Sequence, residues 1–508
     1  MVSVAWQDLF HGFELALQPG NLLWCFIGVT IGNLVGVLPG MGVLSAVSIL
    51  LPLTFGMQPL AAILMIAGIF YGAQYGGAIC SILLNLPCHP PHAVTCLDGY
   101  AMTRQGKGAL ALGISIMGAL FGAAFGILQM TFLAPVIASL AYSFGPTEIC
   151  ALMLLGLVSG ATLSRGSALR GLMMTILGLV LGLVGTDVNT GVERMTLGFV
   201  NLDDGIGLVS LALGLFGVAE FLRNVNALEP VRLDRAAVRL RDMLPGKADM
   251  REAMPAVLRG TLVGSLCSLV PGTGPTISSI LAYALEKKVA RDPSRFGRGA
   301  IAGVAAPETS THSSVQGDFI PTMTLGIPGD AAMALLLGAL VIHGIQPGPR
   351  LLVDHADIFW SLIASFWIGN LMLVVLNVPM IGLWVRLLAI PYKYLYPTAI
   401  FFICIGVFAE NNSTFDVITT LIFGIVGYGI TKLGFHPAPI LLGFVLGPRF
   451  EENFRRALLI SHGDLGTFVD HPISAAILAV TATIVAAKIA FAWSPRSRAA
   501  AGLPSSAE

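Results

Sequence analysis

The sequence is poor in charge. Only 11% of its 508 residues are Asp, Glu, Lys or Arg, whereas a soluble protein carries about 25%. Hydrophobic residues make up 55% of the chain, so we expect most of it to lie in a lipid bilayer. The formal net charge is zero, and no basic surface indicates nucleic-acid binding.

Several chemical motifs are also missing. No Walker loop, nucleophile elbow or zincin motif occurs, so an ATP-driven pump or a membrane hydrolase has no support. The seven cysteines form no C-x-x-C pair and lie mostly in apolar runs, so we interpret them as small core residues and expect no disulfide framework. Cys88-His89-Pro90-Pro91-His92 contains metal-binding residue types, but its two prolines and the lack of a convergent carboxylate argue against a metal site.

No basic region precedes the first apolar run, which argues against a cleaved signal peptide. Glycine and proline, in contrast, are abundant, with 59 and 29 residues. These numbers are too high for a bundle of uninterrupted helices. We count about 10 to 12 apolar segments that approach the length needed to span a bilayer, and several of them are broken.

One broken segment occurs twice. The first copy is Gly28-x-x-x-Gly32-x-x-x-Gly36-x-x-Pro39-Gly40-Met41-Gly42, and the second is Gly260-x-x-x-Gly264-x-x-x-Ser268-x-x-Pro271-Gly272-Thr273-Gly274, displaced by 271 − 39 = 232 residues. Small residues four apart allow close packing of helices, and Pro-Gly then ends the helix. A paired break in two halves is typical of a transporter's substrate site. The alternative is a packed Pro-Gly kink.

The charges that flank the two copies differ. Residues 1–19 and 52–59 lack Lys and Arg, whereas residues 223–259 and 287–298 are rich in them. Because cytoplasmic loops are enriched in Lys and Arg, the first copy is expected to begin and end outside and the second inside. The sequence therefore predicts two repeats of inverted topology.

A second element is also duplicated. The run from Gly76 to Asn85-Leu86-Pro87-Cys88 matches the run from Gly317 to Gly326-Ile327-Pro328-Gly329, with a shift of 328 − 87 = 241. Each half thus supplies two interrupted elements. Helix N-termini after such breaks suit carboxylates, and unwound carbonyls suit a small cation, so we hypothesise co-transport of an anion and a cation.

Single polar residues leave alternatives open. Asn85 lies in an apolar run, where it is either a site residue or makes an interhelical hydrogen bond. Glu308 is either an ion ligand or a loop acid at the membrane interface. Three hydroxyl residues near the breaks are further candidates for an ion or accessory role: Ser81, Thr276 and Thr324.

These motifs together resemble the large membrane subunit of the tripartite tricarboxylate transporters. The resemblance covers nearly the whole chain and is carried by residues 36–42, 71–77, 85–87, 95–100, 105–107, 305–308 and 325–329. It implies a bacterial inner-membrane permease that receives a carboxylate from a periplasmic solute-binding protein and works with a small membrane subunit. It also implies that an ion gradient, usually of sodium, drives transport.

The chain departs from the family at two places. Cys88, His89 and His92 follow Pro87, and Thr309-Ser310-Thr311-His312 follows Glu308. Both lie at the expected site, so the substrate is interpreted as a carboxylate other than citrate. An imidazole of His89 or His92 is a hypothetical extra donor to the anion.

The sequence thus predicts an all-α polytopic membrane protein with re-entrant hairpins. Residues 1–222 and 256–494 form the two repeats, residues 223–255 a cytoplasmic linker and residues 495–508 a polar tail. The expected function is ion-driven import of a tricarboxylate or related carboxylate by alternating access, with no enzyme activity, cofactor or bound metal. A channel or a membrane scaffold subunit is the alternative, and a homodimer is left open. The expected substrate site comprises Pro39, Gly40, Met41, Gly42, Asn85, Pro87, Pro271, Gly272, Thr273, Gly274, Gly326, Pro328 and Gly329.

Overall fold

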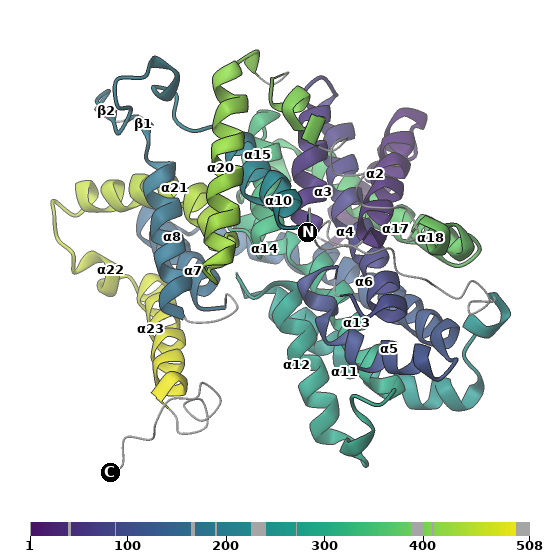
Figure 1. Cartoon of the computed structure of the whole chain (residues 1–508). Coiled ribbons are helices and arrows are strands. Elements are labelled where there is room, and N and C mark those ends of the chain that lie inside the picture. The colour runs from purple at the N-terminus through teal and green to yellow at the C-terminus, as the bar shows by residue number, and fades with distance from the viewer. Residues whose placement is uncertain are drawn as a thin grey trace, which may run out of the picture. The chain divides into compact units, whose positions relative to one another are not determined.

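The computed structural model describes residues 2–38, 42–86, 88–163, 168–187, 190–224, 240–270, 272–387, 400–401, 403–408 and 411–493. Nearly all of these residues are helical (Figure 1). Five helices are long and apolar enough to cross a membrane, namely α2, α4, α6, α17 and α20. The predicted all-α membrane protein is thereby confirmed.

The chain divides into two compact units, of which unit 1 comprises residues 1–142 and 207–430. Its α-helices are α1 (Val2–Ala16), α2 (Pro19–Val37), α3 (Val43–Leu50), α4 (Pro59–Leu84), α5 (Thr95–Arg104), α6 (Gly108–Ala141), α9 (Leu208–Ala212), α10 (Ala219–Asn224), α11 (Lys247–Ser268), α12 (Gly274–Val289), α13 (Ile301–Gly317), α14 (Phe319–Leu325), α15 (Ala331–Ile342), α16 (Leu351–Asp354), α17 (Ala356–Asn377), α18 (Ile381–Leu387) and most of α20 (Thr414–Lys432). Short 3-10 turns are η1 (Leu51–Thr54), η2 (Pro90–Ala93), η5 (Leu240–Met243) and η6 (Pro293–Arg295), and η4 (Leu213–Val218) is a π-helical turn.

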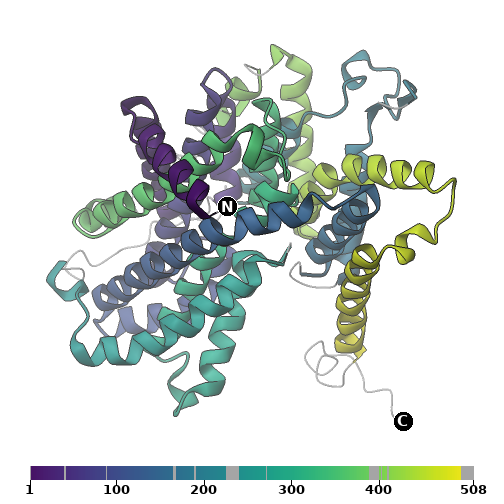
Figure 2. The same ribbon diagram turned by 180° about the vertical axis from the view of Figure 1, so that it is seen from behind.

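Unit 2 comprises residues 143–206 and 431–508. It contains α7 (Pro146–Leu163), α8 (Ala168–Gly182), β1 (Gly185–Thr186), β2 (Glu193–Arg194), η3 (Val200–Leu202), α21 (Ala438–Ile460), α22 (Thr467–Asp470) and α23 (Pro472–Trp493). The two strands pair antiparallel, with Gly185 opposite Arg194. Helix α21 packs against α7 and α8, and α23 packs against α7 (Figure 2).

The first break falls where the sequence predicts it. Helix α2 ends at Val37, and Leu38 is extended, with φ −76° and ψ 120°. A residue that precedes proline is disfavoured in the helical region, so Pro39 accounts for this end. Helix α3 then starts at Val43.

The small residues of α2 form a seam with α4. A Cβ atom added at Gly28, Gly32 or Gly36 would overlap the backbone carbonyl groups of Met65, Ile69 and Ala73, respectively. The two backbones are therefore in direct contact, which only glycine permits.

The same seam recurs between α11 and α13. A Cβ atom at Gly260 would overlap the carbonyl group of Ala306, and one at Gly264 that of Ser310. The shifts relative to the first seam are 260 − 28 = 232 and 306 − 65 = 241, the two shifts found in the sequence. The duplicated motifs therefore pack in the same register in both halves of the chain.

The second pair of elements also ends alike. Helix α4 ends at Asn85 with φ 58° and ψ 28°, and α14 ends at Gly326 with φ 69° and ψ 25°. Both are left-handed C-caps, a conformation that favours Gly and Asn. The halves differ upstream of the cap, because α4 is continuous whereas Asp318 separates α13 from α14.

Candidate functional site

The first break is held by His89. Its Nδ1 accepts a hydrogen bond from the backbone N–H of Val43, the first residue of α3 (3.2 Å), and its Nε2 lies 2.9 Å from the carbonyl oxygen of Ala73 in α4. Because Nδ1 is the acceptor, Nε2 carries the hydrogen and donates it to Ala73. The side chain is buried, so it links the start of α3 to the middle of α4.

The second break makes the corresponding contact. A Cβ atom added at Gly274, the first residue of α12, would lie 3.0 Å from the Cβ of Asp330. These two residues correspond to Gly42 and His89, since 42 + 232 = 274 and 89 + 241 = 330. In the first half, the start of α3 therefore meets the residue four positions after the left-handed cap of α4. In the second half, the start of α12 meets the residue four positions after the left-handed cap of α14.

Elements of the two sequence halves meet within unit 1. The hydroxyl of Ser279 in α12 donates to the carbonyl oxygen of Pro91 in η2, at 3.0 Å. The Tyr75 ring of α4 lies 4.4 Å from the His312 ring of α13, between ring centroids. The two breaks therefore belong to one packed unit and are joined through buried polar side chains.

A buried carboxylate lies between them. Glu308 of α13 is fully buried and accepts hydrogen bonds from the hydroxyls of Thr95, at 2.5 Å, and Ser115, at 3.0 Å. The Nε2 atom of His92 is 3.9 Å from its Oε1. This carboxylate joins α5, α6 and η2 to α13.

A second carboxylate caps α13. Asp98 Oδ1 accepts hydrogen bonds from the backbone N–H groups of Gly297, Gly299 and Ala300, at 2.9, 2.8 and 2.8 Å. Its Oδ2 accepts one from the Tyr283 hydroxyl at 2.9 Å. Burial, together with the neighbouring carboxylate, raises the pKa of Tyr283, so the phenol stays a donor.

Comparison with known proteins identifies the family. The model of the family described as "Tripartite tricarboxylate transporter TctA family" matches residues 22–442. The chain belongs to this family.

Two relatives come from Agrobacterium vitis. One, described as an uncharacterized 52.8 kDa protein in the TAR-I ttuC' 3' region, is 45% identical over 474 residues, which cover 93% of this chain and 94% of that protein. The other, described as an uncharacterized protein in the TAR-II ttuC' 3' region, is 49% identical over 215 residues, which cover 42% of this chain and 89% of that protein. No solved structure matches the chain.

The expected substrate residues of this TctA protein can now be placed. Five of them lie outside the described residues: Pro39, Gly40, Met41, Pro87 and Pro271. The described ones lie at helix ends. Gly42 precedes α3, and Gly272 and Gly274, with φ 84° and 56°, precede and begin α12. Gly326, Pro328 and Gly329 lie between α14 and α15 and are buried. Their role in binding stays a prediction.

Some candidate hydroxyls already have backbone partners. Ser81 donates to the carbonyl oxygen of Leu86 at 3.2 Å, and Thr324 to that of Ile320 at 2.7 Å. Thr273 donates to two carbonyl oxygens at the end of α11. These contacts shape the breaks, whereas Thr276 lies in the first turn of α12, with a partly buried side chain.

Asn85 is exposed and occupies the left-handed cap after α4, and its role as a site residue stays a prediction. Other interpretations of single residues were wrong. Glu308 is not a loop acid, since it lies within α13 and is fully buried. His89 is not an extra donor for an anion, because backbone groups occupy both of its nitrogens. Cys80 and Cys88 are not unpaired core residues, because they form a disulfide across the end of α4.

Sequence reasoning missed Asp318 and Asp330. Both belong to the second duplicated element, and Asp318 is fully buried. An ionisable residue inside an apolar segment is costly and marks a functional site by default. That signal was present in Gly317-Asp318-Phe319-Ile320.

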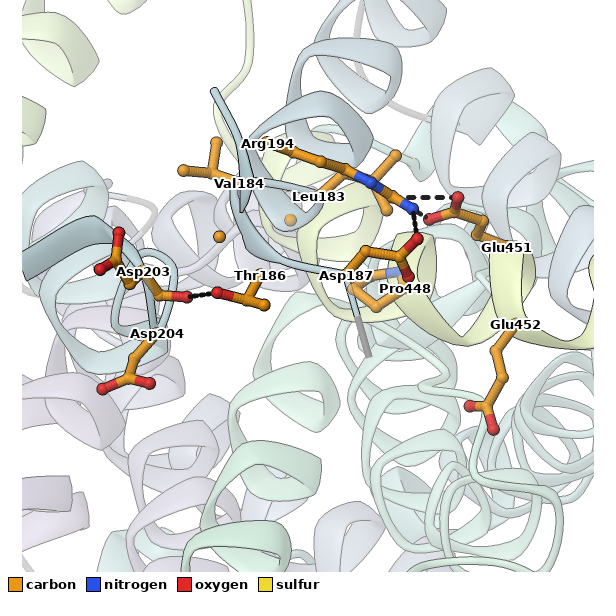
Figure 3. A pocket seen from close by; sticks show the side chains of 12 residues that line it. Leu183, Val184, Thr186, Asp187, Arg194, Asp203, Asp204, Pro448, Glu451 and Glu452 are labelled. Atoms are coloured by element: carbon orange, nitrogen blue, oxygen red, sulfur yellow. Dashed lines mark hydrogen bonds and ion pairs between the residues drawn. The ribbon is translucent and has the colours of Figure 1, made fainter. Parts of the chain in front are cut away.

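Unit 2 contains a separate polar cleft of about 450 Å³. Arg194 of β2 pairs there with Asp187 and with Glu451 of α21, the latter at 2.9 Å (Figure 3). Arg455 also bonds Asp187, at 3.0 Å. The network fastens the β1–β2 segment to α21, so we interpret it as a structural feature of unit 2.

Proposed function

We propose that this TctA-family protein is the large permease subunit of a tripartite transporter in the bacterial inner membrane. It imports a tricarboxylate or related carboxylate by alternating access and uses an ion gradient. A periplasmic binding protein delivers the substrate, and a small membrane subunit completes the complex. Family membership and the five membrane-length apolar helices support a multi-pass, non-enzymatic transporter.

The observation that carries this proposal is the duplicated contact at the breaks. The start of α3 meets His89, and the start of α12 meets Asp330, at equivalent positions of the two halves. Two equivalent interruptions of the backbone inside one apolar unit fit the substrate sites of transporters with inverted repeats. A packed Pro-Gly kink needs no such equivalence.

The residues around the two breaks favour the first break as the place where the substrate carboxylate binds. Its histidine is held by hydrogen bonds to two uncharged backbone groups, and no carboxylate is bonded to the start of α3 among the described residues. The second break has Asp330 beside it, whose Oδ1 caps α15 by accepting the Met333 N–H at 2.8 Å. A negative charge at that position repels an anion. We therefore place the substrate carboxylate next to Gly42 and the start of α3.

Uptake into proteoliposomes tests the function. Purified protein, alone and with its small membrane subunit, is reconstituted and supplied with labelled carboxylates, with and without an inward sodium gradient. Accumulation of a carboxylate above its external concentration is expected when the gradient is present. Movement that only equalises the two concentrations would favour the channel alternative, and no movement with any assembled complex would favour the scaffold.

The variant Gly272→Val probes the second break directly. A β-branched residue at φ 84° is strained by about 1–3 kcal/mol. This strain disfavours the native turn by about 5- to 150-fold, and we expect uptake to fall within that range. The matched control is Gly56→Val, where a Cβ meets no atom within 4 Å. Normal uptake by correctly inserted Gly272→Val protein would count against a role for this turn. Gly40→Val is the equivalent substitution in the first break, since 40 + 232 = 272.

A further inference from the structure

Asp318 is a buried acid without adequate partners. It lies at the junction of α13 and α14 and is 0% exposed. Its Oδ1 receives one long hydrogen bond from the Ser314 hydroxyl, at 3.4 Å, and its Oδ2 has no hydrogen-bond partner. A buried carboxylate in this state requires either a proton or a cation.

A second carboxylate converges on the same turn. A Cβ atom added at Gly329 would lie 3.0 Å from the Cγ and 3.2 Å from the Oδ1 of Asp318. Asp330 follows Gly329 directly and is only partly buried. Gly329 therefore packs against the Asp318 carboxylate and carries the next residue, Asp330, beside it.

Among the described residues, no Lys, Arg or His nitrogen forms an ion pair with Asp318 or Asp330, so no basic side chain there neutralises either acid. The C-terminal end of helix α11 approaches this turn, because a Cβ atom added at Gly317 would overlap the Ser268 side chain. The C-terminus of α11 carries partial negative charge, and the N-terminus of α15, which Asp330 caps, carries partial positive charge. These two helix ends offset one another, so the two carboxylates give the turn its attraction for a cation.

The acid pair is specific to the second half. Asp318 and Asp330 correspond to Gly77 and His89, since 318 − 241 = 77 and 330 − 241 = 89. In the first half, the His89 ring lies beside Gly77, and neither residue is acidic. The two halves share their backbone geometry, but only one of them is built for positive charge.

We propose that Asp318, Asp330 and the backbone of the Gly326–Gly329 turn bind a sodium ion. Sodium, like other hard cations, takes several oxygen ligands. Two carboxylates, the Ser314 hydroxyl and the carbonyl groups of a non-helical turn provide these, whereas a proton needs only one oxygen. The assignment rests on the proposed function, since it names the site of the ion that drives uptake.

Sodium binding is tested without substrate, on the full-length protein in detergent. The apparent melting temperature is measured against sodium chloride concentration at constant pH, with choline chloride keeping the ionic strength constant. A ligand that binds the folded state raises the melting temperature with its concentration. The variants are Asp318→Asn, Asp330→Asn and, as a matched exposed carboxylate of unit 1, Asp354→Asn.

We expect sodium, but not choline, to stabilise the wild type and Asp354→Asn to the same extent. Asp318→Asn should lose the response, and Asp330→Asn should need at least about tenfold more sodium. If Asp318→Asn does not fold, Asp330→Asn alone decides. A wild type that responds to pH but not to sodium, or variants that respond like the wild type, would overturn the proposal. A retained sodium response without carboxylate uptake would overturn the transport function instead.

Discussion

Asp98 shows how one side chain can connect segments that are distant in the sequence. Its carboxylate receives four hydrogen bonds, three from backbone N–H groups of the turn that leads into α13 and one from Tyr283. A carboxylate at a helix N-terminus is also favoured by the helix dipole. The residue therefore fixes α5 against the turn that leads from α12 to α13.

We expect Asp98→Ala to destabilise the protein by about 3 kcal/mol, because it leaves four hydrogen-bond donors, two of them buried, without their acceptor. Tyr283→Phe removes only one of the four bonds and should cost about 1 kcal/mol. Thermal unfolding in detergent measures both changes. The interpretation fails if Asp98→Ala is no less stable than Tyr283→Phe.

At the scale of single helices, the glycine seams determine how closely two helices pack. At Gly32 and Gly264, any side chain would overlap the backbone of the neighbouring helix. Backbone atoms cannot move aside as a flexible side chain can. The seams therefore fix the distance between α2 and α4 and between α11 and α13.

Gly32→Ala and Gly264→Ala should each destabilise the protein by about 1–3 kcal/mol through overpacking. Gly20→Ala in the first turn of α2 is the control, because no atom lies within 4 Å of its added Cβ. That variant should match or slightly exceed the wild type in melting temperature. Equal stability of Gly20→Ala and Gly32→Ala would show that the seam is looser than described.

The end of α4 makes a chemical prediction of its own. Since Cys80 and Cys88 are joined and the other five cysteines are free, the denatured protein should react with five equivalents of a thiol reagent. Reduction should raise the number to all seven cysteines. Cys88→Ser should give six free thiols before and after reduction, since 5 + 1 = 6. Seven reactive thiols without reduction would contradict the pairing.

At the scale of the molecule, the two halves share two seams, two left-handed caps and two break contacts. The charge pattern further predicts that they cross the membrane in opposite directions.

A membrane-impermeant maleimide tests this direction with Gly56→Cys and Lys288→Cys, both at exposed positions. We expect labelling of intact cells at position 56 alone, and labelling at position 288 only after the membrane is opened. Labelling of both from one side would contradict inverted repeats.

The sequence was sufficient for the features that depend on spacing. Pro39 and the glycines four apart predicted the end of α2 and its packing, because backbone sterics leave few alternatives at such residues. The constant shifts of 232 and 241 residues located the equivalent contacts of the second half. The family followed from the same motifs.

Side-chain partners could not be predicted in this way. Whether Glu308 lies in a loop or a helix depends on Thr95 and Ser115, which are about two hundred residues away in the chain. His89 has the chemistry of an anion donor, and only the fold shows that Val43 and Ala73 occupy it. The acids at positions 318 and 330 become a pair only when the turn at Gly329 brings them together.

The seam between α2 and α4 also restricts how this protein can change shape. Its glycines recur every four residues, and four residues of helix span about 6 Å at 1.5 Å per residue. A shorter movement of α2 along α4 would bring side chains onto carbonyl groups. The two helices can therefore slide past each other only in steps of about that length. Smaller changes of shape must instead arise outside the seam, beyond the end of α2 at Val37.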